Sequence, residues 1–247
     1  MIKTILIDDE PLARSLVKEY LKSYNNISIV AECGDGFEGV KAIAQHKPDL
    51  IFLDIQMPKI TGFEMLELID EPPAVIFTTA FDAFAIKAFE AHAVDYLLKP
   101  FSKERFEKAV NKYLSATDKT KLQTTTNELI QSTNKHYEEQ NRVVVKFGGN
   151  IRILNAGEIF YIEAYDDYVK IFTKDDYFLK KKTMSYFEDT LSQNDFLRVH
   201  RSYIVQLQQI TKIEPFEKGN HVALLKNGKT IPLSRKGYSA LKDKLGL

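Results

Sequence analysis

Three aspartates stand at the ends of short apolar runs, where a charged side chain needs an explanation. Asp54 directly follows the apolar run Leu50–Leu53. Asp8 and Asp9 directly follow the run Thr4–Ile7. A carboxylate at the end of a buried segment needs a partner, because burying an unpaired charge is costly. Three carboxylates close together cannot all stay ionised without a cation, and Mg²⁺ prefers oxygen ligands of this kind. The sequence therefore predicts a magnesium site, provided that the two runs are neighbours in the fold.

A threonine and a lysine end two further apolar runs. Thr79 closes the run that begins at Ala74, and Lys99 follows the run that begins at Val94. A carboxylate nucleophile, a divalent cation, an ammonium group and a hydroxyl are what phosphoryl transfer requires, because that reaction depends on positioning and on neutralising charge. Asp54 is then the candidate acceptor. A cis bond between Lys99 and Pro100 would aim the ammonium group, since a cis bond is otherwise rare.

Plainer structural roles stay open for several of these residues. Asp9 or Glu10, which precede Pro11, could cap the first turn of a helix. Asp54 could cap the turn that follows it. Thr79 could be present for its strand propensity alone. The chemical interpretation depends on whether the fold brings these residues together.

The first half of the chain alternates strand-like and helix-like segments. Strand-like runs are Thr4–Ile7, Ile27–Glu32, Leu50–Leu53, Ala74–Thr78 and Val94–Leu98, and helix-like stretches begin near Pro11, Phe37, Gly62, Ala83 and Ser102. Five such units in a row predict an α/β domain with a parallel sheet covered on both faces. The simplest topology is a five-stranded, doubly wound, flavodoxin-like sheet, in which strands 1 and 3 are neighbours. The three aspartates would then meet at the carboxyl ends of those strands.

The second half changes in composition and pattern. Residues 115–141 are polar without sustained periodicity, which predicts a linker between a first domain, 1–114, and a second domain, 142–247. From Arg142 onward, apolar and polar residues alternate in short runs, which predicts a mainly-β domain. One helix is expected at Met184–Leu191 and a final one from Lys236.

The charge balance divides along the same boundary. Residues 1–114 hold 13 Lys and Arg against 18 Asp and Glu, a net charge of −5, whereas residues 142–247 hold 18 against 12, a net charge of +6. A basic second domain indicates an anionic partner. One cysteine, Cys33, excludes an intramolecular disulfide, and no apolar run approaches the ~20 residues of a membrane helix. We therefore expect a soluble, cytoplasmic protein.

The motifs of the first half, taken together, resemble the receiver domain of response regulators. The matching residues are Asp8-Asp9, Asp54 followed by Met57-Pro58 and Gly62, Thr79-Ala80 and Lys99-Pro100-Phe101. The resemblance implies that a histidine kinase phosphorylates Asp54. It also implies that Asp9, Asp54 and the Gln56 carbonyl bind Mg²⁺ directly and that Asp8 binds it through water. Lys99 would pair with the phosphoryl oxygens, Thr79 would move towards them, and Tyr96 would change its burial, although Tyr96 could instead be an ordinary half-buried strand residue.

The second half resembles the LytTR-type DNA-binding domain. The similarity rests on the segments YIEAYDDYVKIF, FLRVHRSYIVQLQQITKI and LKNGKTIPLSRKGYSALK. It implies a β-rich module that binds double-stranded DNA at repeated promoter sites. The residues that it implies as DNA contacts are Tyr168, Lys170, His200, Arg201, Gln206 and Arg235. Family members often carry asparagine at the position of Gln206, and position 168 varies.

Both resemblances together predict a two-component transcriptional regulator that pairs into a homodimer when Asp54 is phosphorylated. We expect no enzymatic turnover beyond slow self-phosphorylation and self-dephosphorylation. One alternative is a phosphorylation-controlled module whose β domain binds a protein, and salt-dependent DNA binding would separate the two. A second alternative, a metal-dependent phosphohydrolase, is disfavoured because Ile55-Gln56 follows Asp54 where such enzymes carry a second acid.

Overall fold

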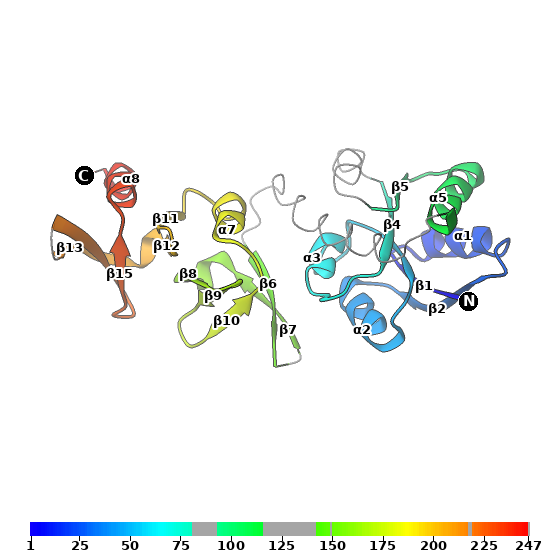
Figure 1. Cartoon of the computed structure of the whole chain (residues 1–247), viewed down its shortest axis with the longest axis horizontal. Coiled ribbons are helices and arrows are strands. Elements are labelled where there is room, and N and C mark those ends of the chain that lie inside the picture. The colour runs from blue at the N-terminus through cyan, green and yellow to red at the C-terminus, as the bar shows by residue number, and fades with distance from the viewer. Residues whose placement is uncertain (81–92, 116–141, 149, 217–218, 247) are drawn as a thin grey trace. The chain divides into compact units, whose positions relative to one another are not determined.

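The computed structural model describes residues 1–80, 93–115, 142–148, 150–216 and 219–246. The chain separates into two compact units, Met1–Thr133 and Asn134–Leu247 (Figure 1). Each unit has a hydrophobic core of its own. The helix predicted to begin near Ala83 and nearly all of the predicted linker lie outside the described residues. Within the described ranges, no helix combines the length and the apolar character needed to cross a lipid bilayer.

The first unit is an α/β fold built on one parallel sheet. Its strands are β1 (Ile2–Ile7), β2 (Ile27–Cys33), β3 (Leu50–Leu53), β4 (Ala74–Thr79) and β5 (Asp95–Leu98), in the spatial order β2-β1-β3-β4-β5. Every neighbouring pair is parallel. This is the order of the flavodoxin-like doubly wound fold, so the predicted fold class is confirmed. The strand order reverses between β1 and β3, which are neighbours.

Helices cover both faces of this sheet. They are α1 (Pro11–Leu21), α2 (Gly36–His46), α3 (Gly62–Leu66) and α5 (Lys103–Ser115). In Figure 1, α1 and α5 lie on one side of the sheet, and α2 and α3 lie on the other. Because both faces are covered, β3 and β4 are buried along their whole length, which explains why β3 is wholly apolar and why the only polar residues of β4 are the two threonines at its end. The stacked rings of Phe52 and Phe106, 5.3 Å apart, join the sheet to α5.

The second unit is mainly β, as predicted. A five-stranded antiparallel sheet has the order β10-β9-β8-β12-β11, a three-stranded sheet has the order β13-β14-β15, and β6 and β7 form a hairpin. The strands are β6 (Arg142–Phe147), β7 (Asn150–Asn155), β8 (Tyr161–Tyr165), β9 (Tyr168–Phe172), β10 (Tyr177–Lys180), β11 (Phe196–His200), β12 (Tyr203–Gln206), β13 (Ile210–Phe216), β14 (Asn220–Leu225) and β15 (Thr230–Leu233). The helices are α7 (Met184–Thr190) and α8 (Arg235–Leu245), so the last helix begins one residue before the predicted Lys236.

The five-stranded sheet of this unit is packed on both faces. One core includes Phe187 of α7, and the other includes Leu241 of α8 together with side chains of the three-stranded sheet. Helix α8 approaches β11 so closely that position 237 excludes a side chain. A Cβ added to Gly237 would lie 1.9 Å from the Val199 carbonyl oxygen. This contact places the amino-terminal end of α8 beside the carboxyl-terminal half of β11.

Candidate functional site

Strands β1 and β3 end at the same edge of the sheet. Their last residues, Ile7 and Leu53, are register partners, and the Asp54 N–H donates to the Ile7 carbonyl oxygen at 2.9 Å. Asp8, Asp9 and Asp54 each place one carboxylate oxygen within 4.8 Å of the others. The three carboxylates therefore meet at one point, because parallel neighbours present their carboxyl ends together.

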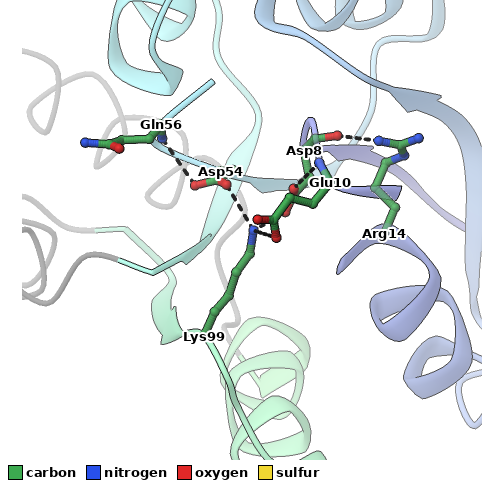
Figure 2. Close-up of polar contacts among 6 residues, drawn as sticks. All are labelled: Asp8, Glu10, Arg14, Asp54, Gln56 and Lys99. Carbon is green, nitrogen blue, oxygen red and sulfur yellow. Dashed lines mark hydrogen bonds and ion pairs between the residues drawn. The ribbon is translucent and has the colours of Figure 1, made fainter. Parts of the chain in front are cut away.

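The ammonium group of Lys99 lies among these carboxylates. Its Nζ is 2.8 Å from Asp8 Oδ2, 3.0 Å from Asp54 Oδ2 and 3.3 Å from Glu10 Oε2 (Figure 2). Burial by itself would lower the pKa of Lys99. Hydrogen bonds to Asp8 and Asp54 outweigh burial and raise this pKa above its ordinary value. Lys99 therefore stays charged at neutral pH and balances part of the negative charge around it.

The acidic cluster fits a divalent cation. Asp8 and Asp54 are buried, whereas Asp9 is more open to solvent. Burial raises the pKa of Asp8, because removing the carboxylate from water penalises its charged form. A bound cation would favour the charged form again. The donors are carboxylate oxygens, which suit Mg²⁺ and are not the nitrogen and sulfur ligands typical of structural zinc.

The loop after β3 sets the position of Asp54. The Gln56 N–H donates to Asp54 Oδ1 at 3.2 Å, which places Gln56 beside the carboxylate (Figure 2). Further along, the main chain at Gly62 closes on Asp54, and a Cβ added there would lie 2.3 Å from the Asp54 carbonyl oxygen. A reciprocal capping box between Thr61 and Glu64 starts α3 and fixes this approach. Glycine at position 62 is thus required by the close contact with Asp54.

Thr79 lies at the carboxyl end of β4 and is fully buried. Among the residues that the structure describes, none forms a hydrogen bond with its hydroxyl group, which is unusual for a buried polar atom. The Lys99 N–H donates to the Thr79 carbonyl oxygen at 2.7 Å, so both residues lie at adjacent strand ends. The bond between Lys99 and Pro100 is cis, as predicted. The Thr79 hydroxyl can therefore take a new partner without losing one among these residues.

Tyr96 lies in β5 and is buried in this structure. It is 5% exposed, and its ring centre lies 6.5 Å from that of Phe77. Arg105 of α5 donates to the Tyr96 carbonyl oxygen at 2.7 Å and forms two hydrogen bonds with the Asp95 carboxylate, at 2.7 and 2.8 Å. These contacts hold the backbone of β5 against α5. The predicted change in Tyr96 burial stays a prediction.

Two residues of the site, Glu10 and Arg14, had no chemical role in the sequence prediction. Glu10 precedes α1, but its side chain makes no capping hydrogen bond and approaches Lys99 instead. Arg14 donates from Nη1 to the Asp8 carbonyl oxygen (Figure 2). The spacing from Glu10 to Arg14 is one helical turn, which places both at the start of α1. That spacing was the one signal in the sequence that could have linked Arg14 to the strand end.

Two predicted DNA contacts lie on the hairpin of β8 and β9. Tyr168 is 42% exposed and is the register partner of Tyr165. The Lys170 ammonium lies 3.7 Å from the ring centre of Tyr165 and 5.4 Å from that of Tyr177. Tyr168 and Lys170 are two residues apart in one strand, so they lie on the same face of the sheet. A single partner could therefore contact both.

Three further DNA candidates lie around the junction of β11 and α8. Arg201 follows β11, and Arg235 is the first residue of α8; both are exposed. The Ser234 hydroxyl donates to the Val199 carbonyl oxygen at 3.1 Å, which ties the start of α8 to β11. Burial and then the charge of Arg201 lower the pKa of His200 below its usual value. His200 is therefore a neutral imidazole near pH 7, under the influence of the permanent charge of Arg201.

Gln206 does not lie where a DNA contact requires it, and this prediction is corrected. Gln206 is 5% exposed at the end of β12. Its side-chain amide donates to the Ala156 carbonyl oxygen at 3.4 Å and accepts a hydrogen bond from Gln209 at 3.0 Å. A buried amide with these partners cannot reach a DNA groove without losing them. The structure instead gives Gln206 a packing role between β12 and the 3₁₀ turn Ala156–Glu158.

Comparisons with known proteins match both units. The family model of the response regulator receiver domain matches residues 4–111, and that of the LytTr DNA-binding domain matches residues 149–246. Transcriptional regulatory protein BtsR of Escherichia coli (strain K12) is 34% identical over 262 residues, covering 100% of both chains. Sensory transduction protein LytT of Bacillus subtilis (strain 168) is 31% identical over 248 residues, covering 99% of both chains.

A solved structure, the response regulatory domain of protein mrkE from Klebsiella pneumoniae, is 29% identical and covers 51% of this chain and 99% of its own, with a TM-score of 0.41. BtsR and LytT therefore match both units of the chain, at more than 30% identity over its full length. The chain therefore belongs to the family of transcriptional response regulators in which a receiver domain precedes a LytTR DNA-binding domain.

Proposed function

We propose that this protein is a phosphorylation-dependent transcriptional regulator of a two-component system, in which Asp54 accepts a phosphoryl group from a histidine kinase in the cytoplasm. We assign residues 1–114 to the receiver domain, 115–141 to a linker and 142–247 to the DNA-binding domain. One observation carries the proposal: the Asp54 carboxylate lies 3.0 Å from the Lys99 ammonium, at the point where Asp8 and Asp9 also meet. The carboxyl edge of the sheet thus holds a nucleophile, a cationic side chain and a set of metal ligands.

The chemistry follows from these groups. A carboxylate oxygen of Asp54 attacks the phosphorus atom, the bond from phosphorus to the kinase histidine nitrogen breaks, and an acyl phosphate forms on Asp54. Asp8, Asp9, Asp54 and the Gln56 carbonyl would hold Mg²⁺, which when bound neutralises charge on the phosphoryl oxygens. Lys99 supplies a further positive charge at the same oxygens.

Thr79 and Tyr96 would carry the response to phosphorylation. The buried Thr79 hydroxyl has no partner among the described residues, so it can donate to a phosphoryl oxygen without losing a hydrogen bond. Its movement would free space near Tyr96, on the neighbouring strand. The altered surface at the carboxyl ends of β4 and β5 would then favour pairing of two receiver domains. Pairing would place two DNA-binding domains on adjacent half-sites, and tethering of this kind can raise avidity by ~10²-fold or more.

The start of α1 offers a surface for the kinase. Leu12 is 85% exposed, and Leu16, one turn later, is 36% exposed. Leu12 is two residues after Glu10, and Leu16 is one helical turn further along α1, so both lie in the helix that begins at the acceptor site. A phosphodonor domain that reaches Asp54 would cover them. Leu12→Asp should therefore slow labelling by the kinase and leave labelling by acetyl phosphate unchanged; equal slowing of both would contradict this surface.

The proposal is tested by labelling the full chain with acetyl phosphate or a phosphorylated kinase in the presence of Mg²⁺. We expect one phosphoryl group per chain in the wild type and none in Asp54→Asn. Asp49→Asn is a matched control, since Asp49 lies at the opposite end of the same strand and bonds to the Lys3 N–H at 2.9 Å. Labelling that survives in Asp54→Asn would refute the assignment of the acceptor.

The DNA-binding role is tested with residues 142–247 alone and with the full chain. We expect both to protect promoter DNA, because the second unit has its own two cores. Affinity should fall steeply with salt, since Lys and Arg displace counterions from phosphates. We expect Arg201→Ala and Arg235→Ala to weaken binding and to reduce its salt dependence. Salt-independent binding would favour a protein partner for this domain instead.

A further inference from the structure

Glu10 occupies the N-cap position of α1 without capping it. Its side chain makes no capping hydrogen bond, and its Oε2 lies 3.3 Å from Lys99 Nζ (Figure 2). The Glu10 N–H donates to Asp8 Oδ1 at 3.0 Å, so both its backbone and its side chain face the acidic cluster. The Glu10 side chain is 66% exposed, against 6% for Asp8 and 8% for Asp54. Among the three carboxylates that contact the Lys99 ammonium, Glu10 is thus the exposed one.

The Lys99 ammonium has three N–H donors, and it lies close to three carboxylates in this structure. A phosphoryl group on Asp54 brings new oxygens within reach of Lys99, so one of the present partners must release it. Asp8 is buried and also held by the Glu10 N–H. The contact with Glu10 is the longest of the three and the most exposed to solvent, where an ion pair is weakest. Glu10 is therefore the partner that Lys99 gives up at the lowest cost.

We propose that Glu10 is a positioning residue that holds the Lys99 ammonium in the unmodified protein and competes with the phosphoryl group for it. The inference rests on the proposed function, since it assumes a phosphoryl group at Asp54. Glu10 makes and breaks no covalent bond in this role. Its effect is to lower the affinity of the site for a phosphoryl group and so to favour the unmodified state.

The inference is tested with beryllium fluoride, a noncovalent mimic of a phosphoryl group on a carboxylate, at saturating Mg²⁺. Calorimetric titration of the full chain is suitable, because the chain has no tryptophan to report binding. We expect Glu10→Gln and Glu10→Asp both to bind the mimic about two- to fivefold more tightly than the wild type, because an exposed ion pair contributes little. Glu19→Gln is the matched control, since Glu19 is an exposed glutamate of the same helix that pairs with Lys22.

Glu10→Asp separates the contact from the charge, because it keeps the negative charge and shortens the side chain by one methylene group. Tighter binding in Glu10→Gln alone would show that general charge, and not the contact with Lys99, is responsible, and would overturn the inference. Unchanged affinity in both variants would overturn it as well. In a Lys99→Ala background, we expect Glu10→Gln to have no further effect. A wild-type chain that binds no mimic would instead refute the proposed function itself.

Discussion

Replacing Gly62 with alanine tests whether the loop after β3 sets the position of Asp54. The added Cβ would lie 2.3 Å from the Asp54 carbonyl oxygen and 3.1 Å from Leu53 Cγ. Real Cβ contacts are essentially never shorter than 3.0 Å, so the two main-chain segments must separate by at least 0.7 Å, the difference between 3.0 and 2.3 Å. The Asp54 carboxylate moves with its main chain. Its contact with Lys99, 3.0 Å in the structure, is then lengthened or lost.

The expected magnitude follows from this displacement. Overpacking of a rigid site costs about 1–3 kcal/mol. A loss of 1 kcal/mol lowers Tm by roughly 4–8 °C in a domain of about 100 residues, so we expect the receiver transition to fall by about 4–24 °C. A misplacement near 1 Å can slow a positioned reaction by about 10²-fold. We therefore expect labelling of Asp54 by acetyl phosphate to slow by about 10- to 100-fold in Gly62→Ala.

Calorimetric melting and the rate of labelling are the two measurements. Gly34→Ala is the matched control in the same domain, because a Cβ there meets only Glu38 Oε2, at an ordinary 3.7 Å. We expect Gly34→Ala to melt close to the wild type and to accept the phosphoryl group at the wild-type rate. If Gly62→Ala melts and reacts like this control, the close approach of position 62 does not constrain Asp54, and the reasoning is refuted.

Three further predictions concern charge, pH and switching. Asp8→Asn removes a buried charge, so without Mg²⁺ the variant should melt no lower than the wild type. Mg²⁺ should raise the Tm of the wild type but not that of the variant, and an equal rise in the two proteins would contradict the metal assignment. The pKa of His200 lies below 6.5 in the folded chain, so the unfolded chain binds more protons near that pH. This contribution to stability is present above about pH 6.5 and is lost as the pH falls below that value. We therefore expect the Tm of the DNA-binding domain to fall less between pH 7.5 and 5 in His200→Gln than in the wild type. An equal fall in both would contradict the lowered pKa of His200. Thr79→Ala should accept the phosphoryl group yet dimerise poorly in sedimentation, and full dimerisation would rule out the role of its hydroxyl.

The sequence was sufficient to predict the receiver fold and the meeting of its aspartates. Strands of a parallel sheet covered on both faces must be apolar almost throughout, as in Leu50–Leu53, so a charged residue directly after such a run marks the strand end. The right-handedness of parallel crossovers leaves few topologies, and the simplest places β1 beside β3. Asp8, Asp9 and Asp54 then meet because of chain connectivity alone.

The tertiary structure alone decided which side chains are covered and which partners they find. The alternation in β12 shows that its residues face two sides, but not that both sides are packed. The family resemblance implies Gln206 as a DNA contact, yet its side chain is buried. Glu10 has the sequence position of a helix cap, yet its carboxylate turns to Lys99, which is distant in the chain and lies beside it only because β1 and β5 end at the same edge. Sequence patterns depend on residues within one helix or strand. Burial and ion pairing depend on residues of other helices and strands, which become neighbours only when the whole chain has packed.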